Sequence, residues 1–150
     1  MDARFEDGGE APIHLKAFEA EGLGVISSLC QDAVFPAHEM QWQAAQRRFA
    51  ILLNRYRWEY TGGPERVQSV LVFEDVLAVQ SQGIERGDAS VVLSLLAVEF
   101  TPGDDGMGRV ELTLAGDGAI ALQVEALEAT LRDVTKPYAA PSGRAPEHGV

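Results

Sequence analysis

The sequence contains a single cysteine, Cys30, in 150 residues. One cysteine cannot form an intramolecular disulfide, so nothing in the chain argues for an oxidising compartment. The sequence also lacks an apolar run of about 18 residues, the length that a membrane-spanning helix needs. Residues 1–12 are acidic and contain glycine, which is the reverse of a secretory leader. We therefore expect a soluble, cytoplasmic protein.

Basic residues are scarce as well. The chain has 12 Lys and Arg against 23 Asp and Glu, which gives a net charge of −11. Such a chain repels nucleic acid and anionic membranes on average, so we expect neither as a partner. A local basic cluster can still act at short range, because charges more than about 10 Å apart are largely screened at ~0.1 M salt.

Catalytic and metal-binding signatures are missing. The histidines are His14, His38 and His148, and their spacing does not match a metal site. A metal site of His14, Cys30 and His38, or a thiol nucleophile Cys30 with His38 as base, stays conceivable. However, Cys30 falls on the apolar face of a predicted helix, where a buried thiol has a raised pKa and is inert.

The turn-forming residues also lack a ligand-binding pattern. The glycines of residues 103–108 precede a strand instead of a helix, so no helix N-terminus is there to hold a phosphate. Asp104, Asp105 and Asp117 could bind a hard cation, but their spacing does not match a calcium loop. We predict no catalytic residue, no cofactor and no metal ion.

Composition predicts one folded domain between two tails. Hydrophobic residues make up 46% of the chain, which is ordinary for a globular protein. Residues 1–11 are expected to be a disordered tail, and residues 139–150, rich in Pro, Gly and Ala, to be another. The single globular domain would then span residues 12–138.

The first half of this domain starts with a short strand and a helix. Residues 13–18 alternate weakly and predict a strand. Residues 20–34 place Leu23, Ile26 and Cys30 on one helical face, and Pro36 would end that helix. Period-two patterns then predict a hairpin over residues 40–54.

The second half continues with period-two strands. Residues 67–79 predict a central strand region that is split near Glu74 and Asp75. Residues 82–88 predict a polar loop. Further strands are predicted over residues 91–100, 110–114 and 120–124, the last two joined by a Gly-Asp-Gly turn.

The end of the domain predicts a second helix. Val124, Leu127, Leu131 and Val134 are spaced as one helical stripe, and Pro137 would stop it. We therefore predict an α+β fold, a mostly antiparallel bent sheet or barrel of seven strands with an early helix and a C-terminal capping helix. This element order is similar to the pleckstrin-homology superfold, a likeness that carries no function.

The segment QRRFAILLNRYRWEY, residues 46–60, is the most unusual one in this acidic chain. If its apolar side chains point inward, parity places Arg55 and Arg57 on the same face, with Tyr56 and Trp58 opposite. Arg66 would lie across from them in the next strand. Two arginines beside aromatic rings could hold a carboxylate or phosphate bidentately.

The same arginines have a structural alternative. They could form cross-strand ion pairs with the nearby acids Glu59, Glu65, Glu74 and Asp75. In a chain with 23 acidic residues, this alternative carries the greater weight.

Several phrases carry a family resemblance: "ISSLCQDAVFPAHEM", "RFAILLNRYRWE", "RVQSVLVFEDVLAVQSQGI", "VLSLLAVEF" and "GDGAIALQVEALEATLRDVTKPYAAPSG". They resemble a bacterial domain-of-unknown-function family, number 2948, over residues 11–143. The resemblance implies no activity, cofactor or catalytic residue. It implies small cytoplasmic proteins often encoded near housekeeping biosynthetic genes, which suits an accessory or regulatory role.

Our leading functional hypothesis is a non-enzymatic protein-interaction or scaffold module. It would bind a peptide along an exposed strand edge, through the region of Trp42, Tyr56, Trp58 and the arginines. The second hypothesis is a small-anion sensor, or an enzyme of unrecognised type, that uses Arg55, Arg57 and Arg66. The third is self-association through the aromatic strand.

Overall fold

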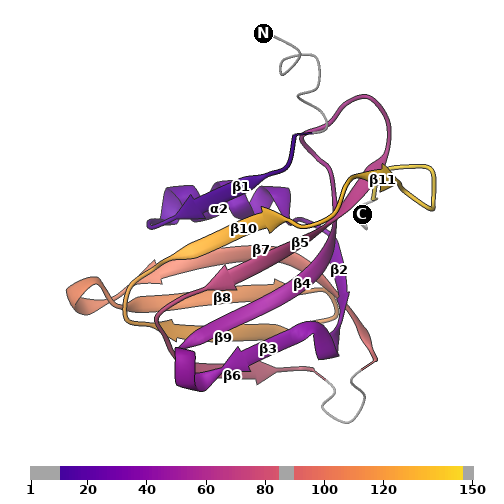
Figure 1. Ribbon diagram of the computed structural model, residues 1–150. Helices are drawn as coiled ribbons and strands as arrows, with labels where there is room; N and C mark the ends of the chain where they lie inside the picture. The colour runs from indigo at the N-terminus through magenta and orange to yellow at the C-terminus, as the bar shows by residue number, and fades with distance from the viewer. Residues whose placement is uncertain (1–10, 85–89, 147–150) are drawn as a thin grey trace, which may run out of the picture.

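The structure, a computed structural model, describes residues 11–84 and 90–146. It is built almost entirely of strands, with one α-helix near the start of the chain (Figure 1). In chain order the elements are β1 (His14–Ala17), α2 (Ala20–Leu29), β2 (Ala33–Pro36), β3 (Met40–Gln43), β4 (Arg48–Tyr56), β5 (Glu65–Phe73), β6 (Val76–Gln82), β7 (Val92–Pro102), β8 (Gly108–Leu114), β9 (Ala119–Val124), β10 (Ala129–Asp133) and β11 (Tyr138–Ala139). Three short 3₁₀ turns are η2 (Ala37–Glu39), η3 (Ala44–Gln46) and η4 (Asp104–Gly106).

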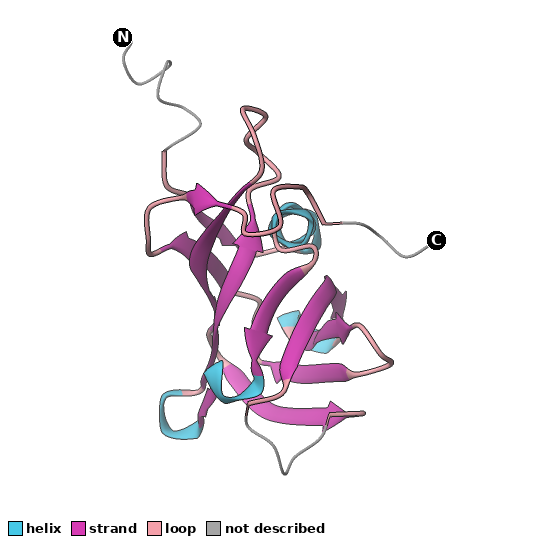
Figure 2. Ribbon diagram, turned by 90° about the vertical axis from the view of Figure 1, so that its right-hand side faces the viewer, coloured by secondary structure: helices cyan, strands magenta, loops and turns pink. Residues whose placement is uncertain are grey.

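The strands form one bent, antiparallel sheet in the order β1-β10-β5-β4-β2-β7-β8-β9-β6. Strand β3 also pairs with β4, and β11 pairs with β5. Figure 1 shows β10, β5 and β4 crossing in front of β7, β8 and β9, and Figure 2 shows these two layers from the side. Strand β2 joins the layers because it pairs with β7 along its length and with β4 at Val34 and Asn54. The sheet is bent, as predicted, but it does not close into a barrel.

The core lies between the two layers, because inward side chains of their strands alternate with outward ones. Fully buried residues include Ile51 of β4, Leu71 of β5 and Leu112 of β8. Helix α2 packs against β7 and β1, and its Leu23 and Ile26 are buried. None of the helices in the described residues is long and apolar enough to span a membrane.

Several predicted elements are confirmed. The hairpin over residues 40–54 forms from β3 and β4, with Met40 opposite Ile51. The split near Glu74 and Asp75 is a sharp turn in which Asp75 takes φ of 57°, a left-handed conformation that Asp tolerates better than most residues. The early helix is also present, but it ends at Leu29, five residues before the expected end, and the following residues form β2. The predicted polar loop over residues 82–88 lies partly outside the described residues.

The prediction of a C-terminal helix is wrong. Residues 124–138 form the end of β9, a connection, β10 and the start of β11. The backbone of this connection bonds to the turn after β5, through Glu125 N–H to the Asp75 carbonyl and Glu74 N–H to the Glu128 carbonyl. Strand β10 then bonds to β1 on one side and β5 on the other, and this pairing overrides the helical spacing.

The predicted number of seven strands is not confirmed either, since the sheet formed by the described residues contains eleven. The pleckstrin-homology-like order is not confirmed, because the described residues lack the capping helix on which it depended. At the expected end of the domain, residue 138, the chain is still in the sheet. Ala139 pairs with Glu65, and Ala140 is buried, with its N–H bonded to the Pro64 carbonyl.

Candidate functional site

Arg55, near the end of β4, and Arg57, just past it, lie at one end of the sheet, and their side chains are buried in the protein. Phe49, Ile51, Leu53 and Arg55 are all buried, so the predicted parity along this strand is confirmed. Arg55 is 0% exposed and Arg57, just past the end of β4, is 1% exposed. Buried guanidinium groups need partners, because removing an unpaired charge from water is very costly.

Arg55 is fully engaged by two carboxylates and a hydroxyl. Its Nη1 and Nη2 donate to the two carboxylate oxygens of Glu59, at 2.9 and 3.0 Å. Nη2 also donates to both oxygens of Asp133, each at 3.0 Å, and Nε donates to Ser69 Oγ at 3.0 Å. This bidentate geometry is the strong form of an arginine–carboxylate pair.

Asp133 joins this cluster to the edge of the sheet. Its side chain is 3% exposed and accepts from Ser69 Oγ at 2.7 Å and from the Ile13 N–H at 2.9 Å. Asp133, Ser69 and Arg55 belong to β10, β5 and β4, while Ile13 precedes β1. The polar network therefore ties together four adjacent strands at the same end of the sheet.

Arg57 is less completely satisfied. Its Nη1 donates to Glu65 at 2.5 Å, and its Nε lies 3.5 Å from Glu59 Oε2. The guanidinium carbon stands 4.8 Å from the centre of the Tyr60 ring, within cation–π range. Nε and Nη2 are both buried and have no hydrogen-bond partner among the described residues.

The carboxylate of Glu59 is held in its charged form by these arginines. Burial alone would raise the pKa of Glu59, but hydrogen bonds from Arg55 and the charges of Arg55 and Arg57 hold that pKa below its ordinary value. Burial would likewise lower the pKa of Arg55, yet Glu59 and Asp133 raise it. Both groups of the pair are therefore ionised at neutral pH.

Acid is expected to destabilise the protein through Glu59. Because its pKa is lower in the folded state than in the unfolded one, Glu59 stabilises the fold above the unfolded-state pKa of about 4.3. That contribution is lost as the pH falls through the folded-state pKa. We expect the difference in unfolding free energy between wild type and Glu59→Gln, from urea titrations, to be constant above pH of about 5 and to shrink below it.

Glu125→Gln is the control, because Glu125 forms an exposed ion pair with Arg47. This variant should lose much less stability at neutral pH than Glu59→Gln, since exposed pairs contribute little. A Glu59→Gln difference that did not change on acidification would contradict the expected role of Glu59.

The structure separates the predicted site residues into different places. Tyr56 and Trp58 pack edge to face with ring centres 4.8 Å apart, and Trp58 Nε1 donates to the Gln31 carbonyl at 2.9 Å. Arg66 donates to the backbone and side-chain oxygens of Asn54, at 3.2 Å each. Trp42 of β3 pairs with Phe49, at the opposite end of β4 from the arginines, and so does not join them.

The alternative interpretation, pairing with nearby acids, matches the contacts of Arg48, Arg55 and Arg57, whereas Arg66 donates to Asn54 instead. Glu59 and Glu65 pair with Arg55 and Arg57, and Glu74 pairs with Arg48 at 3.0 Å. An external anion would therefore have to displace a carboxylate of the protein. Sequence reasoning missed Ser69 and Asp133. The signal for Ser69 was its place between Val67 and Leu71 on an otherwise apolar face.

The chemistry considered for Cys30 is not supported. Cys30 is buried, and burial raises the pKa of its thiol to about 12; the charge of Arg55 lowers this pKa and that of Asp133 raises it further. Such a thiol is not a nucleophile at neutral pH. The described residues contain no group of three His, Cys, Asp or Glu that could hold a metal ion, so His14, Cys30 and His38 are not brought together.

Away from the arginines, a groove lies on the outer face of β6, β9 and β8. The groove, of about 330 Å³, is lined by residues 79–82 of β6, by Ala119 and Ala121 of β9, and by Arg109 and Glu111 of β8. The register places Gln80, Ala121 and Glu111 side by side across the three strands. The groove exists because the alanines of β9 are small and their neighbours on both sides are long.

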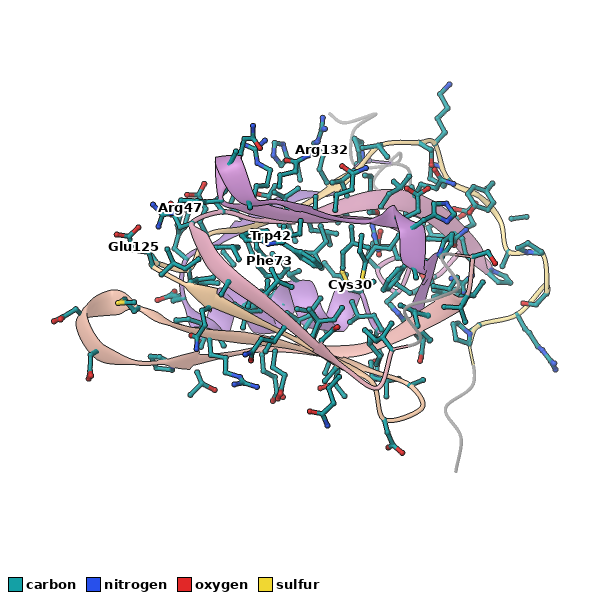
Figure 3. The ribbon with its side chains drawn as sticks, turned by 90° about the horizontal axis from the view of Figure 1, so that it is seen from below. Cys30, Trp42, Arg47, Phe73, Glu125 and Arg132 are labelled. Carbon is teal, nitrogen blue, oxygen red and sulfur yellow. The ribbon has the colours of Figure 1, made fainter. Side chains whose placement is uncertain are left out.

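Figure 3 shows the molecule from below, with side chains of the interior and of the rim labelled. Cys30 and Phe73 point into the space between the layers, whereas Arg47 and Glu125 lie together at the rim. Trp42 lies near Phe73 in this view but is 38% exposed.

Comparison with known proteins identifies a family. The family model described as "Protein of unknown function (DUF2948)" matches residues 13–148, nearly the whole chain. Searches of curated proteins and of solved structures found no match. The resemblance noted in the sequence is thus confirmed, and the chain belongs to the DUF2948 family of proteins of unknown function.

Proposed function

We propose that this protein is a non-enzymatic interaction module that binds an extended segment of a partner protein along strand β6. The observation that carries the proposal is the position of β6 at the end of the sheet. Strand β6 is the last in the hydrogen-bonded order, and in the described part of the chain its strand partner is β9 alone. An edge of this kind is a template for a further strand.

Strand β6 has few of the devices that protect sheet edges. Natural edge strands are usually short, charged, interrupted by proline or bulged. The sequence of β6, VLAVQSQ, has seven residues and neither a charge nor a proline, although a bulge follows Val76. Leu77 is 44% exposed. By contrast, the other end of the sheet is β1, which has four residues and includes Lys16.

The start of β6 is already anchored. Val76 N–H donates to the Arg47 carbonyl at 2.9 Å. The part of β6 that binds the partner would therefore begin after Val76, at residues 77–80. The groove beside β6 would receive side chains of the added strand, over the small floor of Ala119 and Ala121. The net charge of −11 opposes a second copy of this chain and favours a basic segment.

The test compares partner capture by wild type and by a β6 variant, Ala78→Lys with Gln80→Lys. Lysine on the edge should block strand addition without disturbing the core, because both residues are exposed. The matched control is His14→Lys on β1. Pull-down from a lysate of the cells that make the protein should return a partner with wild type and with the control, and lose it with the β6 variant.

The captured complex should also protect the backbone amides of β6 from hydrogen exchange. A lysate that returned no partner would count against the proposal, as would a partner that the β6 variant captured equally well. Capture of the chain itself, with a dimer seen by light scattering, would replace the foreign partner with self-association.

A further inference from the structure

We infer that Arg57 and Arg55 form a binding site for one carboxylate of a ligand, and that Glu59 occupies this site when the ligand is absent. This site is separate from the β6 edge and independent of the function proposed for it. Its residues come from the end of β4 and from the loop between β4 and β5.

Glu59 has the geometry of a bound ligand. Its carboxylate lies end-on against Arg55 with two parallel hydrogen bonds of 2.9 and 3.0 Å, and Oε2 also faces Arg57 Nε at 3.5 Å. Its side chain is 23% exposed, whereas that of Asp133, on the inner side of Arg55, is 3% exposed. The two carboxylates of the Arg55 pair therefore differ in access to solvent, and Glu59 is the one that can be exchanged.

The second observation is that two nitrogens of Arg57, Nε and Nη2, are buried without a hydrogen-bond partner among the described residues. Nη2 is buried and lacks an acceptor in the part of the chain that the structure describes, while Glu65 takes Nη1. Leaving a buried charged donor unsatisfied is unfavourable, and such groups in native proteins call for an explanation. A ligand carboxylate that bridged Arg57 Nη2 and Arg55 would supply the missing acceptor, which Glu59 does not.

The charges of the cluster select the ligand. Two guanidinium groups face three carboxylates, those of Glu59, Glu65 and Asp133. When Glu59 leaves, a single carboxylate restores the same balance. A phosphate dianion would add a further negative charge beside the buried Asp133 and the partly exposed Glu65, so the site should prefer a carboxylate.

The loop that carries Glu59 allows this exchange. It also decides how strongly Glu59 competes with a ligand for the arginines. Residues 57–64 connect β4 to β5 and contain Gly62 and Gly63, the latter with φ of 145°. Because Glu59 is tethered next to its site, it competes as an intramolecular ligand at high effective concentration. A small free carboxylate should therefore bind wild type weakly and bind a variant without the Glu59 carboxylate more strongly.

The experiment is a thermal-unfolding titration of Glu59→Ala with sodium acetate, against sodium chloride at the same ionic strength. Acetate at tenfold its dissociation constant should raise the Tm by about 3–5 °C, and the Tm should keep rising with the logarithm of the acetate concentration above that point. Wild type should shift less at the same concentration. The extra stabilisation of the variant over wild type should be smaller in sulfate than in acetate, a difference that removes the general stabilisation of both proteins by sulfate. Adding Arg57→Ala to Glu59→Ala should abolish the acetate effect.

Two further variants keep the result decisive. Glu59→Gln keeps the shape of the side chain, and saturation-transfer NMR of acetate can be measured on it if Glu59→Ala does not fold. Glu125→Ala, which breaks the exposed pair with Arg47, should behave as wild type. Absence of acetate-specific binding in both Glu59 variants would overturn the inference, and so would an acetate effect that survives Arg57→Ala.

Discussion

Replacing Arg55 with alanine is expected to lower the free energy of unfolding by about 3–5 kcal/mol. The variant leaves Asp133, 3% exposed, with the Ser69 hydroxyl and the Ile13 N–H as its remaining donors among the described residues. It also removes the bidentate partner of Glu59. Since domains of this size are stable by about 5–15 kcal/mol, the loss is a large part of the total. Urea unfolding monitored by tryptophan fluorescence measures it.

Arg47→Ala is the matched control for Arg55→Ala. Arg47 pairs with Glu125 at the rim, where both side chains are largely exposed, so its loss should cost less than about 1 kcal/mol. In a double-mutant cycle, Arg55→Ala and Asp133→Ala should together cost less than the sum of the single variants, because they share one contact. Equal losses for Arg55→Ala and Arg47→Ala would show that burial does not govern the strength of these pairs.

Replacing Leu131 with alanine is expected to cost about 2–5 kcal/mol, whereas Val134→Ala should change stability by no more than about 0.5 kcal/mol. Leu131 is fully buried in β10, opposite Leu71 of β5, so truncation leaves a cavity. Val134 follows the strand and is 41% exposed. The difference between the two variants, measured by urea unfolding, separates the strand from the helix that the sequence predicts.

The helical alternative gives the opposite result for Val134. In a helix, Leu131 and Val134 would lie on one stripe against the core, and both truncations would be costly. A large loss of stability in Val134→Ala would therefore contradict β10 as it stands in the structure. The outcome does not depend on the function of the protein.

Most of the strands could be predicted because their side chains alternate. In β4, Phe49, Ile51 and Leu53 are the buried residues of an apolar run, and the period of two places Arg55 on the same face. The helix α2 was predictable from Leu23 and Ile26, but its end was not. Residues 30–34 continue the helical spacing, yet Asp32 takes φ of 64° and its N–H bonds to the Leu95 carbonyl, which starts β2.

The C-terminal region was mispredicted because its spacing suits two structures. Val124, Leu127 and Leu131 are all buried, as a helical stripe requires, but they lie in β9, in a connection and in β10. Local periodicity does not contain the information that β1 and β5 offer unpaired edges on both sides of this segment. Strand pairing with distant residues decided the conformation.

The site residues also divide into those that could be proposed from the sequence and those that could not. The candidate arginines and two of their acidic partners, Glu59 and Glu65, are neighbours in the sequence and could be proposed from it. Asp133 could not, because it lies 78 residues from Arg55 and in a segment with a helical pattern. Trp42 was grouped with the arginines because it precedes them closely, yet the hairpin carries it to the other end of β4.

By itself, the sequence determined that this acidic chain forms alternating antiparallel strands, that an amphipathic helix comes early, and that Arg55 points inward. These properties follow from the periods of 2 and 3.6 residues, which operate within one element. Only the tertiary structure decided which edge of the sheet stays open, which acids face the buried arginines, and that residues 129–133 form a strand. These depend on contacts between distant residues, whose energies exceed the local preferences of any short segment.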